Sequence, residues 1–173
     1  MLKVKKIITG ELLENCYIIE SDKSCLIVDP GSDFHKIVKE VTLPVLGVLI
    51  THRHFDHIGD LEEVLEKYKC QLFDYYSTDE EEFKVREFNF SVINTPGHTE
   101  DSVCYYFFND KIMFTGDFLF KGSIGRCDLG GNETDMRKSI EKIKKYDDDI
   151  VIYPGHGDKS TLKEEKEFNI YLS

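Results

Sequence analysis

The sequence predicts an α/β fold in a single domain that spans residues 1–173. Short apolar runs recur along the chain and indicate strands, while other segments carry apolar residues at helical spacing and indicate helices between them. With 40% hydrophobic residues the chain is able to bury a substantial core, and no linker or internal repeat divides it. The strands and the recurring helices are therefore expected to pack as one α/β unit.

The first part of the chain carries closely spaced strand candidates, the third of which ends in the turn signal Asp29-Pro30-Gly31. A longer apolar run then predicts a buried strand, and the residues after it have apolar side chains at helical spacing. The strands expected in this part are Lys3–Ile8, Cys16–Glu20, Ser24–Val28 and Val45–Ile50, and the expected helices are Phe34–Val41 and Ile58–Tyr68.

The remainder of the chain continues the same alternation. Asn109-Asp110 lies between two strand candidates and reads as a hairpin turn. The glycine-rich stretch Phe120–Gly131 is expected to be irregular. The expected strands are Cys70–Phe73, Lys84–Phe88, Phe90–Asn94, Val103–Phe108, Lys111–Phe114 and Asp149–Tyr153, and the expected helices are Thr134–Tyr146 and Leu162–Phe168.

Residue types that bind metals are concentrated in a few short segments, each of which follows a predicted strand. The segments are T-H-R-H-F-D-H at 51–57, T-P-G-H-T at 95–99, T-G-D at 115–117 and Y-P-G-H-G at 153–157. Neutral imidazole and carboxylate hold Zn, Mn or Fe while leaving positions open for water and substrate. The candidate ligands are His52, His54, Asp56, His57, His98, Asp117 and His156.

A lone histidine in a loop is usually a surface residue, and His35 is expected to be one. The cluster at 51–57 differs because it directly follows the predicted strand Val45–Ile50. If the chain stays extended beyond that strand, the side chains at 52, 54 and 56 leave the same face. His57 then lies at the turn into the next helix. The sequence therefore predicts a metal site at this strand end.

The charge of the chain disfavours a nucleic-acid partner. The formal net charge is −11, and no Lys/Arg stripe is seen beyond Lys142, Lys144 and Lys145 on a solvated helix face. A nucleic-acid binder needs a cationic surface that neutralises phosphates. A small anionic substrate stays compatible with this charge, because bound metals supply positive charge at the site.

The N-terminal segment Met1–Ile8 is interpreted as a first strand and not as a signal peptide, and no run is long enough to span a membrane. The five cysteines are odd in number and show no C-x-x-C spacing, which favours reduced thiols. We therefore expect a cytoplasmic protein without a membrane partner, present as a monomer or small homo-oligomer.

The order of the four metal-binding segments resembles the metallo-β-lactamase superfamily, and more narrowly its glyoxalase II-like (hydroxyacylglutathione hydrolase-like) members. The likeness begins at Asn15-Cys16-Tyr17, includes Val28–Gly31 and Gly122–Arg126, and ends at Glu165–Asn169. It implies an αββα sandwich, in which two mixed β-sheets pack face to face with helices outside. It also implies a first metal on His52, His54 and His98, a second on Asp56, His57 and His156, and Asp117 bridging both.

The resemblance further implies a binuclear hydrolase that uses two divalent ions, with zinc expected and iron or manganese as alternatives. A metal-bridging hydroxide, formed because metals lower the pKa of water towards ~7, attacks the carbonyl of a thioester such as S-lactoylglutathione. Asp56 is the expected catalytic residue and orients this hydroxide. An aspartate at 117, where several β-lactamases have a cysteine, points away from antibiotic hydrolysis.

Three residues are candidates for contacting a small acyl-thiol substrate. Arg126 either binds a substrate carboxylate or pairs with Asp128 to order its loop. Lys121 is a weaker candidate, and Tyr153 either touches substrate or packs in the core. The chain ends at Ser173, so the C-terminal helical domain with which glyoxalase II grips glutathione is expected to be missing.

Two other functions stay open at this stage. A persulfide dioxygenase resembles this pattern but uses one iron, held by residues matching His52, His98 and Asp117 in some combination. The same imidazoles and carboxylates serve iron and zinc, so the ligand types do not separate them. A metal-binding module without catalytic activity is the alternative from a different class.

Overall fold

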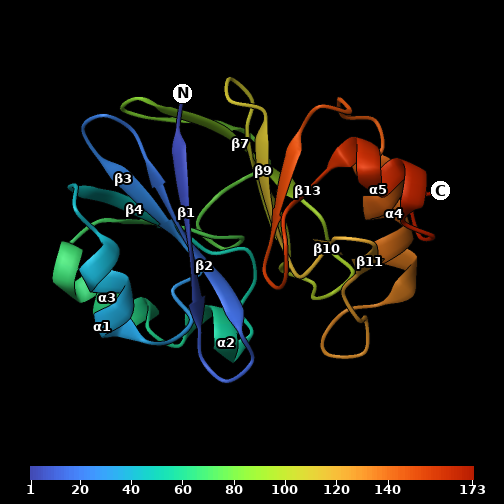
Figure 1. Cartoon of the computed structure of the whole chain (residues 1–173). Helices are drawn as coiled ribbons and strands as arrows, with labels where there is room; N and C mark the ends of the chain where they lie inside the picture. Colours follow the sequence, from blue (N-terminus) through green and yellow to red (C-terminus); the bar gives the residue numbers. More distant parts are fainter.

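The computed structural model describes residues 1–173 and shows two β-sheets packed face to face, with helices on both outer faces (Figure 1). The first half of the chain makes one sheet and its helices, on the left of Figure 1, and the second half makes the other. The α/β class and the αββα arrangement implied by the resemblance are confirmed.

The first sheet has five strands in the order β1-β2-β3-β4-β5. The first three strands are antiparallel, whereas β4 and β5 are parallel to β3, so the sheet is mixed. Parallel neighbours need a crossover, and helices supply it here. The strands are β1 (Lys3–Thr9), β2 (Glu14–Glu20), β3 (Cys25–Val28), β4 (Val45–Leu49) and β5 (Gln71–Phe73).

The second sheet has six strands in the order β13-β12-β9-β8-β7-β6, in which only the β12–β9 pair is parallel. A separate two-stranded hairpin, β10–β11, lies in the stretch expected to be irregular. The strands are β6 (Glu82–Val85), β7 (Phe88–Asn94), β8 (Val103–Phe107), β9 (Ile112–Gly116), β10 (Leu119–Phe120), β11 (Ser123–Ile124), β12 (Val151–Pro154) and β13 (Ser160–Thr161).

Five helices complete the fold. The first sheet is covered by α1 (Phe34–Glu40) and α3 (Leu61–Tyr68), and the second by α4 (Glu133–Ile143) and α5 (Leu162–Phe168). A single helical turn, α2 (Phe55–Ile58), follows β4 near the β1–β2 hairpin (Figure 1). No helix is both long and apolar enough to cross a membrane.

The buried side chains form three apolar layers, as a four-layer sandwich requires. Strand β2 shows the principle, since all seven of its residues are buried. Tyr17 and Ile19 enter the layer between the two sheets, while Cys16 and Ile18 enter the layer under the first pair of helices. Successive side chains of a strand point to opposite faces, so a strand covered on both sides has no polar alternation.

The predicted helix Ile58–Tyr68 is wrong at its start, because the chain forms α2 and α3 with a break at Gly59-Asp60. A Cβ at Gly59 would lie 2.2 Å from the carbonyl oxygen of Gly31, and the Asp60 amide donates to the Pro30 carbonyl. The turn after β3 therefore holds the break in place. The expected extended path through residue 56 is also wrong, since the chain turns helical at Phe55.

The predicted strand Lys84–Phe88 is also wrong. Strand β6 ends at Val85, and Arg86-Glu87 form a turn in which Arg86 has φ 54°. This turn carries no glycine, proline or asparagine, so the usual hairpin signal is missing from the sequence. The short strands β10, β11 and β13 were not predicted, because two residues are too few for a periodic pattern.

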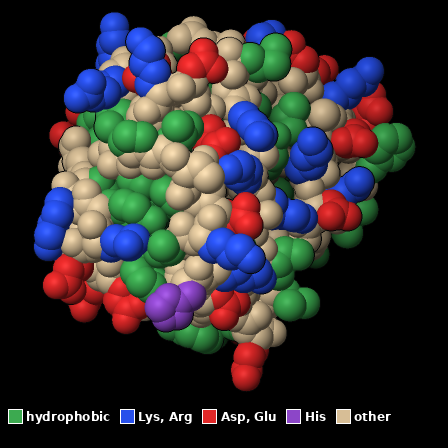
Figure 2. Space-filling model, turned by 60° about the vertical axis from the view of Figure 1, so that its left-hand side comes forward, with side chains coloured by type: hydrophobic (Ala, Val, Ile, Leu, Met, Phe, Trp, Pro, Cys, Tyr) green, Lys and Arg blue, Asp and Glu red, His purple; other side chains and the backbone are tan.

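Charged side chains of both signs share the molecular surface. On the face drawn in Figure 2, lysine and arginine are interspersed with aspartate and glutamate, and hydrophobic side chains lie between them. Opposite charges in contact on the surface include Lys111 with Asp149 at 2.5 Å and Lys166 with Asp148 at 2.6 Å. Such exposed pairs contribute little to stability, so the apolar layers carry most of it.

The hydroxyl of the fully buried Tyr105 joins the two sheets, since it lies 2.8 Å from the carbonyl oxygens of Ile50 and Phe73. We expect Tyr105→Phe to lower the free energy of unfolding by about 1–2 kcal/mol, because it removes a buried hydrogen bond. Urea denaturation measures this change. The exposed Tyr171→Phe serves as the control and leaves the midpoint unchanged. Equal urea midpoints for the two variants would show that the contacts of the Tyr105 hydroxyl with Ile50 and Phe73 do not stabilise the packing of the two sheets.

Candidate metal centre

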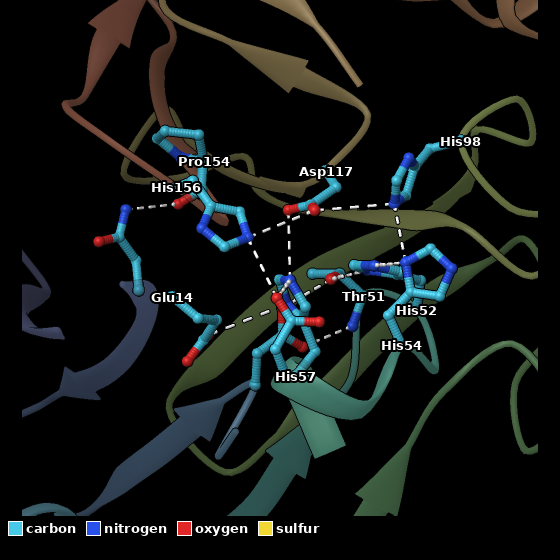
Figure 3. A network of polar contacts seen from close by, with 12 residues as sticks. Glu14, Thr51, His52, His54, His57, His98, Asp117, Pro154 and His156 are labelled. Carbon is cyan, nitrogen blue, oxygen red and sulfur yellow. Dashed lines mark hydrogen bonds and ion pairs between the residues drawn. The ribbon is translucent and has the colours of Figure 1, made fainter. Parts of the chain in front are cut away.

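All seven predicted ligands lie together, and Figure 3 labels every one of them except Asp56. They come from both sheets, in every case from the segment that follows a strand. His52 and His54 follow β4, and α2 then contributes Asp56 and His57. The second sheet supplies His98 after β7, Asp117 after β9 and His156 after β12.

Three imidazoles form the first group. The Nε2 atom of His52 lies 3.2 Å from Nδ1 of His54, and Nε2 of His98 lies 3.0 Å from the same atom. These three nitrogens converge on one small space, as three ligands of one cation do. The group coincides with the set that the resemblance implies for the first metal.

The second group combines a carboxylate with two imidazoles. The Oδ2 atom of Asp56 lies 3.3 Å from Nε2 of His156 and 3.6 Å from Nε2 of His57. Ligand atoms of all three residues lie within 4.8 Å of one another. This group coincides with the set implied for the second metal.

Asp117 lies between the two groups (Figure 3). Its Oδ2 atom is 3.6 Å from Nε2 of His98 in the first group and 3.4 Å from Nε2 of His156 in the second. Its Oδ1 atom is 3.3 Å from Nε2 of His57. A carboxylate in this place can offer one oxygen to each of two cations, so its position suits the bridging role implied by the resemblance.

In each imidazole, one ring nitrogen points toward the other ligands, and the second nitrogen contacts a residue outside the ligand set. Backbone carbonyls accept from three of the outer nitrogens: Leu129 from His54 at 2.9 Å, Arg126 from His98 at 2.7 Å and Leu12 from His156 at 3.1 Å. A carbonyl only accepts, so the outer nitrogen carries the hydrogen and the inner one keeps its lone pair in the neutral ring. The backbone thereby fixes the tautomer that binds a metal.

Asp29 lies outside the predicted ligand set but contacts it directly. Its Oδ2 atom accepts from Nδ1 of His57 at 2.9 Å, and its Oδ1 atom accepts from the backbone amide of Thr51 at 2.8 Å. One buried carboxylate therefore orients a ligand and ties down the loop that begins the cluster. An aspartate placed between a buried strand and a proline turn, here with φ 49°, is the signal that could have found it.

Glu14 was also not identified. Its side chain is buried, its Oε2 atom accepts from the Thr9 hydroxyl at 2.6 Å, and its Oε1 atom lies 3.9 Å from Nδ1 of His57. Burial is the main cause that raises the pKa of Glu14 to about 9. The carboxyl is therefore neutral at pH 7 and adds no charge beside Asp29.

The metal-free centre attracts protons where a cation fits. Burial disfavours a charged imidazole at His57 and His156, but contacts with carboxylates outweigh it at both. Asp117 and Asp29 raise the pKa of His57, and Asp117 and Asp56 raise the pKa of His156 to about 10. His52 has no comparable carboxylate contact, and burial lowers its pKa. Positive charge is therefore favoured around Asp117.

Two glycines allow the backbone to approach this aspartate closely. Gly116 has φ 51°, and a Cβ there would lie 2.3 Å from the Thr51 hydroxyl oxygen. A Cβ at Gly155 would lie 2.2 Å from Oδ1 of Asp117. A larger residue at either position would displace the carboxylate or the loop that faces it.

The residues present fit a binuclear metal centre. The Nε2 atom of His57 and the Oδ1 atom of Asp117 are buried without a hydrogen-bond partner, although they lie only 3.3 Å apart. Leaving such atoms unsatisfied costs about 1–3 kcal/mol each, and a cation ligated by both removes that cost. Five neutral imidazoles with the carboxylates of Asp56 and Asp117 form a donor set suited to divalent transition metals.

A cavity of about 680 Å³ opens onto the centre. Arg126 lines it, but its guanidinium holds Asp128 through two hydrogen bonds of 2.6 Å, which is the loop-ordering alternative. Lys121 is exposed and does not line the cavity. Tyr153 lies outside it too, where its ring packs on Phe114 at a centroid distance of 5.2 Å.

A family model described as the metallo-beta-lactamase superfamily matches residues 9–88 and 74–156. The chain belongs to the metallo-beta-lactamase superfamily. This confirms the family suggested by the order of the motifs, and it accounts for the His and Asp clusters, since members of this superfamily typically bind metal ions.

Two relatives match nearly end to end. A probable metallo-hydrolase, YqgX of Bacillus subtilis, is 32% identical over 99% of this chain and 98% of its own length. The hydroxyacylglutathione hydrolase GloC of Haemophilus influenzae is 27% identical over 92% of this chain and 93% of its own length. These similarities place the chain with the metallo-hydrolases and are consistent with its glyoxalase II-like character.

Three solved structures share the superfamily fold. The BLEG-1 B3 metallo-beta-lactamase superposes with a TM-score of 0.94 and 31% identity, covering 99% of this chain and all of its own. TTHA1623 in a di-iron-bound form superposes with a TM-score of 0.87 and 26% identity, covering 97% of this chain and all of its own. ETHE1 from Myxococcus xanthus superposes with a TM-score of 0.86 and 26% identity, covering 97% of this chain and 83% of its own.

We expect Asp29→Asn to weaken zinc binding by about 10- to 100-fold, because the amide no longer supplies the charge that orients His57. Competition with a chromophoric chelator measures the affinity. Asp22→Asn, on the exposed β2–β3 turn, is the matched control and leaves the affinity unchanged. Equal affinities for wild type and Asp29→Asn would show that this contact is structural only.

We expect His54→Ala and His156→Ala each to reduce the bound zinc from about two ions to about one per chain, because each residue belongs to a different group. Asp117→Ala is expected to weaken zinc binding at both groups of ligands and to abolish hydrolase activity. Elemental analysis after dialysis measures the stoichiometry. Retention of activity by Asp117→Ala, or loss of both ions in His54→Ala, would contradict the assignment of the two groups.

Proposed function

We propose that this protein is a binuclear metal-dependent hydrolase that cleaves acyl thioesters of the hydroxyacylglutathione type. The observation that carries the proposal is the carboxylate of Asp117 between two groups of ligands, at the floor of an open cavity. Relatives named hydroxyacylglutathione hydrolase, among them GloC, support the thioester as substrate. The cavity of about 680 Å³ has a volume usual for small-molecule sites.

The composition of the cavity supports attack by water. Its lining contains no serine, threonine or cysteine that could act as a covalent nucleophile. Bound divalent metals supply Lewis acidity and lower the pKa of a water molecule towards ~7. Hydrolysis in one displacement by water is therefore the chemistry that this set of residues favours.

The protein's own residues position the reactants. Asp56 lines the cavity, and its Oδ2 atom lies 3.6 Å from Nε2 of His57 and 3.3 Å from Nε2 of His156. Its other carboxylate oxygen is available to accept a hydrogen bond from the attacking water, which is the role we propose for it. The outer contacts of the imidazoles keep the ligand geometry fixed while the cavity stays open for exchange of substrate and product.

Zinc is the metal we propose, with iron and manganese as alternatives. Imidazole and carboxylate bind all three, so the donor set leaves the choice to supply and geometry. The similarity to TTHA1623 in its di-iron-bound form favours testing iron beside zinc. The similarity to ETHE1 makes a mononuclear-iron persulfide dioxygenase the second candidate, and the similarity to BLEG-1 adds hydrolysis of a β-lactam.

We expect the zinc-loaded protein to release thiol from S-lactoylglutathione, and His98→Ala to lose this activity because the first group of ligands is broken. A thiol-reactive chromophore measures the release. His35→Ala is the matched control, since His35 is exposed on α1, and it retains full activity.

The same preparations separate the alternatives. Iron-loaded protein that consumes oxygen with glutathione persulfide, and zinc-loaded protein that releases no thiol, would replace the hydrolase by the dioxygenase. Turnover of a chromogenic cephalosporin alone would assign the β-lactam reaction. Protein that holds its metals but turns over none of these substrates would point to a metal-binding module without catalytic activity.

A further inference from the structure

We infer that the site selects thioesters with an apolar acyl chain, and that four side chains around the cavity mouth hold that chain. This inference rests on the proposed thioester hydrolysis and adds a preference among acyl groups, in which a longer apolar chain is favoured over a short polar group such as lactoyl. The four side chains, here called the collar, are Leu12, Phe55, Phe120 and Leu129. All four line the cavity that contains Asp56, Asp117 and three of the histidines.

Three of the four collar side chains are exposed, and Phe120 is half-buried. The exposed fraction is 54% for Leu12, 74% for Phe55 and 50% for Leu129. Apolar side chains gathered on the surface around a concave site mark the place where a ligand covers them. Because they share a cavity with the metal-binding residues, the ligand that covers them is the substrate of that centre.

The collar comes from separate parts of the chain. Leu12 lies in the turn between β1 and β2, Phe55 is the first residue of α2, and Leu129 lies in the loop before α4. Phe120, the fourth collar residue, belongs to β10, and the centroid of its aromatic ring lies 6.1 Å from that of the His156 imidazole. An apolar group extending from the reaction centre therefore meets hydrophobic surface on several sides.

Outside the metal centre, the cavity offers no free cationic side chain to an anionic group of the substrate. Arg126 is the only lysine or arginine in the lining, and Asp128 already occupies its guanidinium. The carriers of biological thioesters are polar thiols, so the part of such a substrate that matches an apolar collar is its acyl chain. A polar carrier can extend through the open mouth into solvent.

The collar also touches the metal centre through its backbone. The Leu12 carbonyl accepts from Nδ1 of His156, and the Leu129 carbonyl accepts from Nε2 of His54. These contacts do not depend on the side chains. Replacing either leucine by serine removes apolar surface and leaves the carbonyl that orients the imidazole, which makes the collar separable from metal binding.

Binding of product-like carboxylates tests the inference without turnover. We expect zinc-loaded protein to bind hexanoate at least about tenfold more tightly than acetate in isothermal titration, because four methylene groups leave water. Leu12→Ser and Leu129→Ser are expected to reduce this preference by about threefold or more each, with bound zinc unchanged by elemental analysis. Phe168→Ser, which removes an apolar residue that is even more exposed (76%) and lies outside the cavity, is the control and keeps the preference.

Turnover of thioesters that share one thiol tests the same selectivity. With N-acetylcysteamine as the common thiol, kcat/KM is expected to rise about tenfold or more from the acetyl to the hexanoyl ester, and to rise less in the two collar variants. A carboxylate preference without thioester turnover would overturn the proposed reaction and keep the apolar site. Thioester turnover with equal kcat/KM across chain lengths, or variants that change the oligomeric state in place of selectivity, would overturn the collar.

Discussion

The carboxylate of Asp117 is the constraint around which the site is built. It is largely buried, it lies within 3.3–3.6 Å of imidazoles from both ligand groups, and one of its oxygens has no hydrogen-bond partner. A buried carboxylate is tolerated only with compensating positive charge. The close approach of Gly155 and the left-handed turn at Gly116 show that the backbone is shaped to keep it there.

The seven ligands come from distant parts of the chain and meet because the two sheets pack together. Loops after strands of both sheets reach the same point, and buried contacts hold them in register. Asp29 binds Thr51 and His57, and Tyr105 reaches from the second sheet to Ile50, just before the first ligand segment. Stability and site geometry therefore depend on the same buried polar contacts.

The walls of the cavity and the ligands are parts of one network. The carbonyls of Leu12, Arg126 and Leu129 accept hydrogen bonds from histidines, and the same three residues line the cavity. Side chains there can change substrate preference without altering the metal geometry, because the orienting group is the backbone.

The α/β class, most strands and the seven ligand candidates could be predicted from local patterns, because periodicity and ligand-rich segments need no knowledge of distant contacts. These patterns did not reveal the break at Gly59-Asp60, Asp29 and Glu14 beside His57, or the placement of Lys121 and Tyr153 outside the cavity. Those features arise from contacts between residues far apart in the chain. The packing of the two sheets sets the distances between these residues. It therefore fixes which backbone carbonyl accepts a hydrogen bond from which imidazole, and which side chains line the cavity.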